Sequence, residues 1–217
     1  MFCRTCRGPA DAGFARCYQC NQAIRQAGGL LADAVAPIGY AVRGGRLAGD
    51  LRHYKSDRPE AAAAAARLRE LLSAFLRDHG GSVWRAAGME AGPSAVAVVP
   101  SGQGRPGRHP LAGLVARCVD LPPIRLSVAP AAVPVRGVSL GWLRPDGPVA
   151  GADVLVVDDT WVSGGSAQSA AAALKLAGAR RVAIVVLGRH VNPADRGSAR
   201  FLAALRARPA SAPTRRG

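Results

Sequence analysis

Two adjacent carboxylates followed by a Ser-Gly turn mark the stretch VLVVDDTWVSGGSAQSA, residues 154–170. Its apolar start predicts a buried strand, with Asp158 and Asp159 at the end of that strand. The turn VSGGS, residues 162–166, has small residues that let backbone amides approach an anion, and it leads into an alanine-rich helix whose N-terminus favours negative charge. Because the turn has neither GKS or GKT nor GxGxxG, we expect it to bind a phosphate monoester.

Two carboxylates and a phosphate dianion repel one another at short range, so something neutral or cationic must lie between them. A ribose meets this need, because its 2- and 3-hydroxyls can donate to Asp158 and Asp159 while its 5-phosphate lies in the turn. A divalent metal ion can share the charge of the acids. In the simpler alternative, Asp159 and Ser163 only cap a turn and a helix, which does not explain two acids followed by SGGS.

Four cysteines form two CxxC pairs, Cys3 with Cys6 and Cys17 with Cys20, and ten residues separate the pairs. Each CxxC bends tightly enough to direct two thiolates to one point, and two such knuckles supply the sulfur ligands that zinc prefers. Four protein sulfurs leave no open position, so the zinc is predicted to be structural. The alternatives are a disulfide pair and a thioredoxin-like redox motif. Cys118, on an apolar helical pattern, is predicted to be a small core residue.

The chain of 217 residues carries a net charge of +15 and has a pI of about 11.3. Clustered cations gain from counterion release on a polyanion, so this charge suggests a nucleic-acid partner. The arginines are scattered, however, and only Lys55 and Lys175 stand against twenty-seven arginines. The charge therefore favours a weak association with nucleic acid through a basic surface over a dedicated site.

The composition is that of a folded protein with one main domain, because 49% of the residues are hydrophobic, 20% are charged and the mean hydropathy is +0.09. No apolar run approaches the ~20 residues that a bilayer span needs. Residues 1–20 carry charges and cysteines where a secretory signal needs an apolar stretch. We therefore expect a cytoplasmic protein without a membrane span.

Apolar strands alternate with amphipathic helices along the chain, which predicts an α/β fold with a parallel sheet covered on both faces. The expected elements are a strand, turn and short helix in 37–59, a helix from Pro59 to about 78, a strand, Gly-rich loop and helix in 94–119, short strands in 124–150, a strand at 153–157, a helix at 165–178 and a strand at 181–187. Ligands of such sheets bind beyond the carboxyl ends of the strands. The loops expected there are 100–109, 158–166 and the one after 187.

The stretch VLVVDDTWVSGGS resembles the phosphoribosyl pyrophosphate (PRPP) motif of type I phosphoribosyltransferases: apolar strand residues, two acids, a spacer, and a turn of Ser/Thr, small, any, Ser/Thr. With the cysteine knuckles, YKSDRP and VVPSGQGRPGRHPLAGLV, the chain is similar to the ComF-like amidophosphoribosyltransferase group over about residues 1–192. This resemblance implies a parallel-sheet, Rossmann-like phosphoribosyltransferase core with a small N-terminal zinc ribbon. It divides the chain into a zinc ribbon at 1–24, a phosphoribosyltransferase domain at 35–192 and a disordered basic tail at 203–217.

The resemblance also assigns roles to individual residues. The ribose 5-phosphate of PRPP would be bound by Asp158, Asp159, Thr160, Val162, Ser163, Gly164, Gly165 and Ser166. The pyrophosphate would be bound by Ser101, Gly102, Gln103, Gly104 and Arg105, for which a solvated turn is the alternative. Lys55 matches the lysine of a mobile loop that closes over the ligand, with an exposed lysine as the alternative. Asp158, Asp159 and Lys55 are the implied catalytic residues.

The implied reaction displaces pyrophosphate from C1 of PRPP by a nucleophile. Acids near the ribose ring would stabilise positive charge there, and Mg²⁺ with Arg and Lys would hold the leaving pyrophosphate. His190, in LGRHVNP, is positioned to approach the site, or else is an ordinary loop histidine. Residues 125–150 match the family loosely and RPGRHP replaces the common RGFNQ, so the acceptor nucleophile is not specified.

A second hypothesis keeps the same fold without catalysis. The chain would then be a PRPP-sensing protein or a competence and DNA-uptake accessory protein, whose zinc ribbon and arginines engage a partner. A homodimer is a further expectation under either hypothesis.

Overall fold

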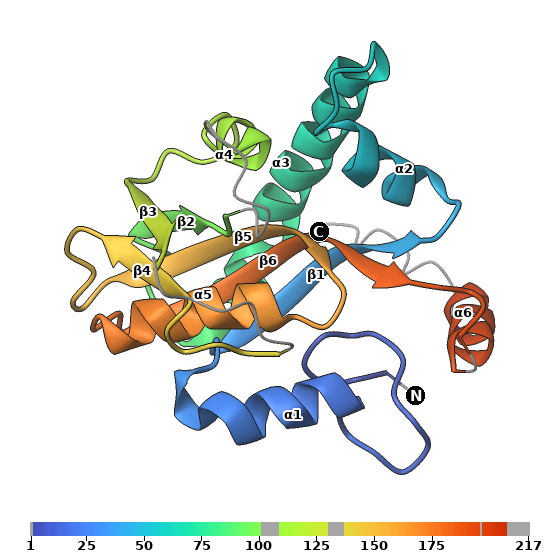
Figure 1. The fold of residues 1–217 in the computed structure, drawn as a ribbon, viewed down its shortest axis with the longest axis horizontal. Helices are drawn as coiled ribbons and strands as arrows, with labels where there is room; N and C mark the ends of the chain where they lie inside the picture. Colours follow the sequence, from blue (N-terminus) through green and yellow to red (C-terminus); the bar gives the residue numbers. More distant parts are fainter. Residues whose placement is uncertain (1, 101–108, 130–136, 196, 208–217) are drawn as a thin grey trace, which may run out of the picture.

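A six-stranded sheet forms the centre of the computed structural model (Figure 1), which describes residues 2–100, 109–129, 137–195 and 197–207. The strands, in their order across the sheet, are β1 (Ala34–Val42), β6 (Arg181–Val191), β5 (Asp153–Trp161), β2 (Ala95–Val98), β3 (Pro123–Val128) and β4 (Leu143–Asp146). Neighbouring strands pair in parallel, except that β3 and β4 pair antiparallel. The predicted α/β fold with a mostly parallel sheet is therefore confirmed.

Helices cover both faces of this sheet (Figure 1). One face packs against α2 (Arg46–His53), α3 (Glu60–Ala87) and α4 (Pro110–Val115). The other face packs against α5 (Gly165–Leu176) and, beyond it, α1 (Tyr18–Ala27) and the short 3-10 helix Gly28–Leu30. This double cover explains why the central strands read as continuous apolar runs.

Alternate residues of β5 belong to two different cores. Leu155 and Val157 pack on the side of α2, α3 and α4, whereas Val154 and Val156 pack on the side of α5. The buried cysteines share the second core, so the knuckles are packed onto the sheet rather than held apart from it. This alternation decides which way the two acids that follow are directed.

Three elements extend beyond their predicted ends. Helix α3 was expected to stop at about residue 78, but it continues past Gly80, which packs against the ring of Trp84. It is capped by Gly88, whose backbone is in the left-handed conformation (φ 72). Strand β5 was expected at 153–157 and β6 at 181–187. Both are longer because the pairs Thr160 with Gly188 and Trp161 with Arg189 continue their ladder. A local apolar pattern does not reveal such pairing between distant segments.

A final helix, α6 (Ser198–Arg206), enters the range in which a disordered tail was expected, so that expectation is wrong for residues 203–206. The helix docks through Phe201, whose ring lies 5.0 Å from that of Phe2 and 5.2 Å from that of Tyr40. Residues 208–217 lie outside the described part of the chain. Among the described helices, none combines the length and the apolar character that crossing a membrane requires.

The two outer strands of the sheet each contain a proline. Pro37 lies in β1 and Pro145 lies in β4. Proline has no backbone N–H, so each outer strand lacks one donor.

Two leucines of α5 test the assignment of the core. Leu174 is fully buried. Leu174→Ala is therefore expected to lower the free energy of unfolding by about 2–5 kcal/mol, because apolar burial is lost and a cavity remains. Leu176→Ala is the matched control in the same helix, because Leu176 is 58% exposed, and its effect should stay within about 0.5 kcal/mol. Denaturant unfolding followed by circular dichroism measures both values. Equal losses for the two variants would contradict the assigned core.

Candidate functional site

Asp158 and Asp159 lie inside β5, which continues to Trp161, and not beyond the end of the strand as expected. Because side chains alternate along a strand, the two carboxylates are directed to opposite faces of the sheet. Asp159 meets Tyr54, a member of the core around α3, and Asp158 is directed to the α5 side. The two acids therefore have different environments.

Asp159 is held by two side chains that follow α2. The Tyr54 hydroxyl donates to Oδ2 of Asp159 at 2.6 Å, and the Lys55 ammonium forms an ion pair with the same oxygen. Tyr54 and Asp159 are only 5% and 7% exposed. Burial, and then the charge of Asp159, raises the pKa of Tyr54 above its usual value, so the hydroxyl keeps its proton and remains a donor. The structure thus brings the predicted residues Lys55 and Asp159 together.

Asp158 is half-buried, and its Oδ1 accepts a hydrogen bond of 2.9 Å from the backbone N–H of Asp159. Removal of its carboxyl from water, followed by repulsion from Asp159, raises the pKa of Asp158 to about 7. Near neutral pH this carboxyl can therefore either hold or accept a proton, as a general acid or base must.

Two glycines of the turn stand where no larger residue would fit. Gly164 has a φ of 85, and a Cβ atom there would overlap the ring of Trp161. A Cβ atom on Gly165 would overlap the carbonyl oxygen of Gly137. The sequence suggested that small residues serve the approach of a ligand, whereas here they first serve the close packing of the protein against itself.

The two serines of the turn are accessible to solvent. Ser163 is half-buried and its Oγ accepts a hydrogen bond of 3.3 Å from the N–H of Gly165. Ser166 is exposed in the first turn of α5, and Val162 beside them is 60% exposed. Hydroxyls and the helix N-terminus therefore lie together at the carboxyl edge of the sheet, an arrangement suited to an anion.

The predicted pyrophosphate loop, Ser101 to Arg105, lies outside the described residues. The chain leading to it can be placed, because the N–H of Val99 donates to the carbonyl oxygen of Val157 at 3.0 Å. This segment therefore leaves the sheet directly beside Asp158. His190 lies within β6, opposite Ala41 of β1, and not in a loop.

The four predicted zinc ligands form a cluster, called here the four-cysteine centre: Cys3, Cys6, Cys17 and Cys20. Their Sγ atoms all lie within 4.8 Å of one another, and those of Cys6 and Cys17 are 3.8 Å apart. A tetrahedral zinc site with Zn–S bonds of about 2.3 Å requires sulfurs about 3.8 Å apart. All four cysteines are free, so the disulfide alternative is wrong and the donor set fits zinc.

Arg189 connects the four-cysteine centre with the turn. Its side chain is buried, and Nη1 donates to the carbonyl oxygens of Trp161 and Val162, both at 3.0 Å. On its other side, a Cβ atom on Gly8 would lie 2.6 Å from Nε. Hydrogen bonding with Cys17 and Cys20 lowers the pKa of the Cys6 thiol, and the charge of Arg189 acts in the same direction.

Sequence reasoning missed both Tyr54 and Arg189. Each is the direct neighbour of a residue that was singled out, Lys55 and His190. Adjacency to a candidate was the available signal for Tyr54. Arg189 also adjoins a candidate, but the sequence does not reveal its burial, which depends on Gly8 and Trp161, two residues far apart along the chain.

A groove of about 380 Å³ is lined by residues of the knuckles and of the turn. Its lining includes Arg4, Arg7 and Arg16, Ser163 of the turn, and Asp33 just before β1. Three arginines against one carboxylate make this groove electropositive, and it reaches from the turn toward the start of β1.

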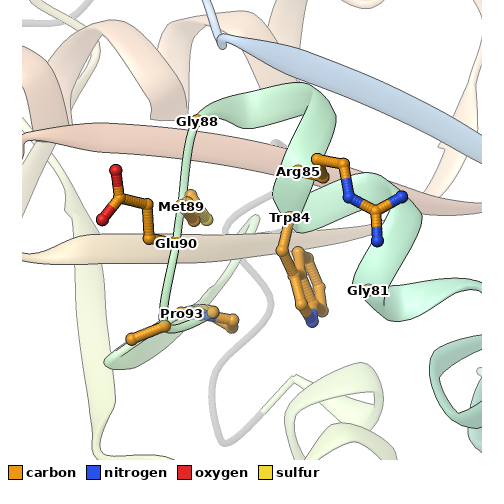
Figure 2. A pocket seen from close by; sticks show the side chains of 9 residues that line it. Gly81, Trp84, Arg85, Gly88, Met89, Glu90 and Pro93 are labelled. Atoms are coloured by element: carbon orange, nitrogen blue, oxygen red, sulfur yellow. The ribbon is translucent and has the colours of Figure 1, made fainter.

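A second hollow, of about 650 Å³, lies where α3 ends and the chain turns toward β2; Figure 2 shows Trp84, Arg85 and Glu90 around it. A Cβ atom on Gly88 there would lie 3.3 Å from Nε of Arg181, the first residue of β6. The hollow therefore lies at the amino ends of the strands. It is not part of the candidate site at their carboxyl ends.

Comparison with models of protein families and with curated protein sequences gives no match. Among solved structures, PRPP synthetase from Mycobacterium smegmatis is 19% identical over 62% of this chain and 36% of that chain, with a TM-score of 0.36. An allosteric regulatory enzyme of purine biosynthesis is 18% identical over 63% of this chain and 30% of that chain, with a TM-score of 0.42. A phosphoribosyltransferase from Corynebacterium diphtheriae is 26% identical over 71% and 77%, with a TM-score of 0.33. This chain thus spans only about a third of the first two structures, and likenesses at these TM-scores do not assign it a function.

Proposed function

We propose that the chain is a Mg²⁺-dependent phosphoribosyltransferase, which binds PRPP and transfers its phosphoribosyl group to a nucleophile with release of pyrophosphate. The observation that carries this proposal is the position of Asp159, which is held by Tyr54 and Lys55 in a strand that runs directly into the Ser-Gly turn. Carboxylates at this place can accept ribose hydroxyls, and the turn offers amides and hydroxyls to the 5-phosphate. The resemblance of VLVVDDTWVSGGS to the PRPP motif supports the same assignment.

Lys55 has a double role in this proposal. In the structure it neutralises Asp159, so a ribose that approaches Asp159 competes with the ammonium for the same Oδ2. We expect Lys55 to move from Asp159 to the pyrophosphate of the ligand, where its positive charge stabilises the leaving group. Tyr54 stays behind and keeps Asp159 hydrogen-bonded and oriented.

Asp159, once Lys55 has moved to the pyrophosphate, is also the residue proposed to hold Mg²⁺ together with the ligand, because this ion prefers carboxylate and phosphate oxygens. When bound, Mg²⁺ would neutralise charge on the leaving pyrophosphate. Asp158 is proposed to accept the proton of the incoming nucleophile, since its raised pKa suits it for that step near pH 7. Both acids would stabilise positive charge that develops on the ribose ring.

The proposal also covers the organisation of the chain. The zinc ribbon at 1–24 would stabilise the fold through its metal, and the domain at 35–192 would carry the reaction. The alternative of a PRPP-sensing or DNA-uptake accessory protein gains support from the arginine-lined groove. PRPP binding without pyrophosphate release, across a screen of amines and bases, would favour that alternative.

The acidic pair provides the first test. The double variant Asp158→Asn with Asp159→Asn is expected to bind PRPP in the presence of Mg²⁺ about 10- to 100-fold more weakly than the unaltered chain, since charge-assisted hydrogen bonds are lost. Isothermal titration calorimetry measures the affinities. Asp78→Asn is the control, because Asp78 is an exposed residue of α3. Undiminished binding by the double variant, or no binding by the unaltered chain, would count against the proposal.

The raised pKa of Asp158 gives a second test. The ionised form accepts the ribose hydroxyls, and a carboxyl whose pKa is about 7 must lose its proton before it can do so. Affinity for PRPP should therefore rise as the pH increases from about 6 to 8, by up to about tenfold per unit below the pKa. Titration of the phosphates of PRPP continues in Asp158→Asn, so the difference between the two pH profiles isolates Asp158. Identical profiles would refute its role.

The four-cysteine centre gives a third test. Purified protein is expected to contain a single zinc ion per chain, and Cys3→Ser should lose most of it, because a thiolate ligand is removed. Elemental analysis measures the zinc content. Cys118→Ser is the matched control, since Cys118 Sγ contacts the carbonyl oxygen of Leu114 and lies outside the centre. Equal zinc contents in the two variants would contradict the site.

A further inference from the structure

Arg189 has a buried positive charge that is not balanced by a carboxylate in the described part of the chain. Arg189 is 8% exposed, and none of the ion pairs among the described residues includes it. A buried guanidinium without a counter-charge is strongly unfavourable. The three carbonyl oxygens that accept from Nη1, of Trp161, Val162 and His190, supply only dipoles.

The four-cysteine centre is the nearby group that can balance this charge. Four thiolates around one Zn²⁺ carry a net charge of about −2. Nε of Arg189 is a buried polar atom without a described hydrogen-bond partner, and it lies on the side that faces the knuckle, 2.6 Å from where a Cβ atom on Gly8 would stand. Gly8 has no positive φ, so a glycine is needed there for space and not for its conformation.

The same guanidinium fixes the start of the phosphate-binding turn. Trp161 and Val162, whose carbonyl oxygens accept from Nη1, directly precede Ser163, and the ring of Trp161 lies against Gly164. One rigid, planar group is therefore in contact with the backbone that leads into the turn and with the backbone of the knuckle.

We propose that Arg189 is a positioning residue that couples the metal content of the four-cysteine centre to the geometry of the turn at residues 162–166. With zinc bound, the negative centre keeps the guanidinium buried, where it holds the two carbonyl groups. Loss of zinc releases the knuckle, so the backbone at Gly8 no longer packs against the guanidinium. The guanidinium then moves toward water, and the turn loosens. The ligand of that turn follows from the proposed function, whereas the coupling itself does not depend on it.

Three substitutions separate charge from geometry. Arg189→Met removes the charge, Arg189→Lys keeps it without the planar fork, and Gly8→Ala pushes the guanidinium away while leaving every charge in place. Arg117→Met is the control, because it removes the same charge from an exposed position. Zinc affinity is measured by transfer to a colorimetric chelator, and the turn is monitored by hydrogen exchange of peptides that contain residues 162–166.

Arg189→Met is expected to weaken zinc binding by about tenfold or more, as loss of groups around metal ligands commonly does. It should also accelerate exchange in the turn. Gly8→Ala should share both effects, and Arg189→Lys should retain more zinc affinity than Arg189→Met but not the slow exchange. A purely structural role would accelerate exchange without changing zinc affinity, and that result would overturn the proposal.

Removal of zinc completes the test. Zinc-free wild-type protein should exchange faster in the turn, while zinc removal from Arg189→Met should add little further acceleration. The same factor in both proteins would refute the coupling. Fast exchange in β2 and α3 would reveal that the zinc-free protein unfolds. In that case the zinc-saturated variants decide the question. If the turn exchanges as slowly in Arg189→Met and Gly8→Ala as in wild type, the proposal is refuted. None of these measurements uses PRPP, so a failure of PRPP binding is distinguished from a failure of the coupling.

Discussion

The ladder between β5 and β6 is the constraint on which the carboxyl edge of the sheet depends. It runs without a shift of register from Asp153 opposite Arg181 to Trp161 opposite Arg189. A slip by one residue would exchange the two faces of β5, so Asp159 would lose Tyr54 and point toward α5. The fully buried valines on both faces penalise such a slip, because apolar and polar positions would no longer match their surroundings. Core packing thereby sets the chemistry at the edge.

The two acids illustrate how one strand creates two different groups from the same residue type. Asp159 accepts a hydrogen bond from the Tyr54 hydroxyl and forms an ion pair with the Lys55 ammonium. The Asp158 carboxyl is removed from water and repelled by the charge of Asp159, and both effects raise its pKa. Pairs whose environments differ in this way commonly divide the tasks of holding charge and transferring protons. The strand's two-residue period is sufficient to separate these tasks.

Much of the fold and part of the site could be predicted because their signals are local. The apolar runs located β5 and β6, the CxxC pairs located the four-cysteine centre, and SGGS located the start of α5. The ends of the strands could not be predicted, since they depend on partners far along the chain. Tyr54 and Arg189 were missed for the same reason: their roles come from what the fold places beside them.

The prolines in the two outer strands have a consequence for behaviour in concentrated solution. An open sheet edge normally presents a regular row of donors and acceptors to which another chain can add a strand. Pro37 in β1 and Pro145 in β4 each remove one backbone donor from an outer strand. A strand that contains proline is a less regular template for sheet growth, so the two outer strands are poorer partners for an added strand than the central strands would be.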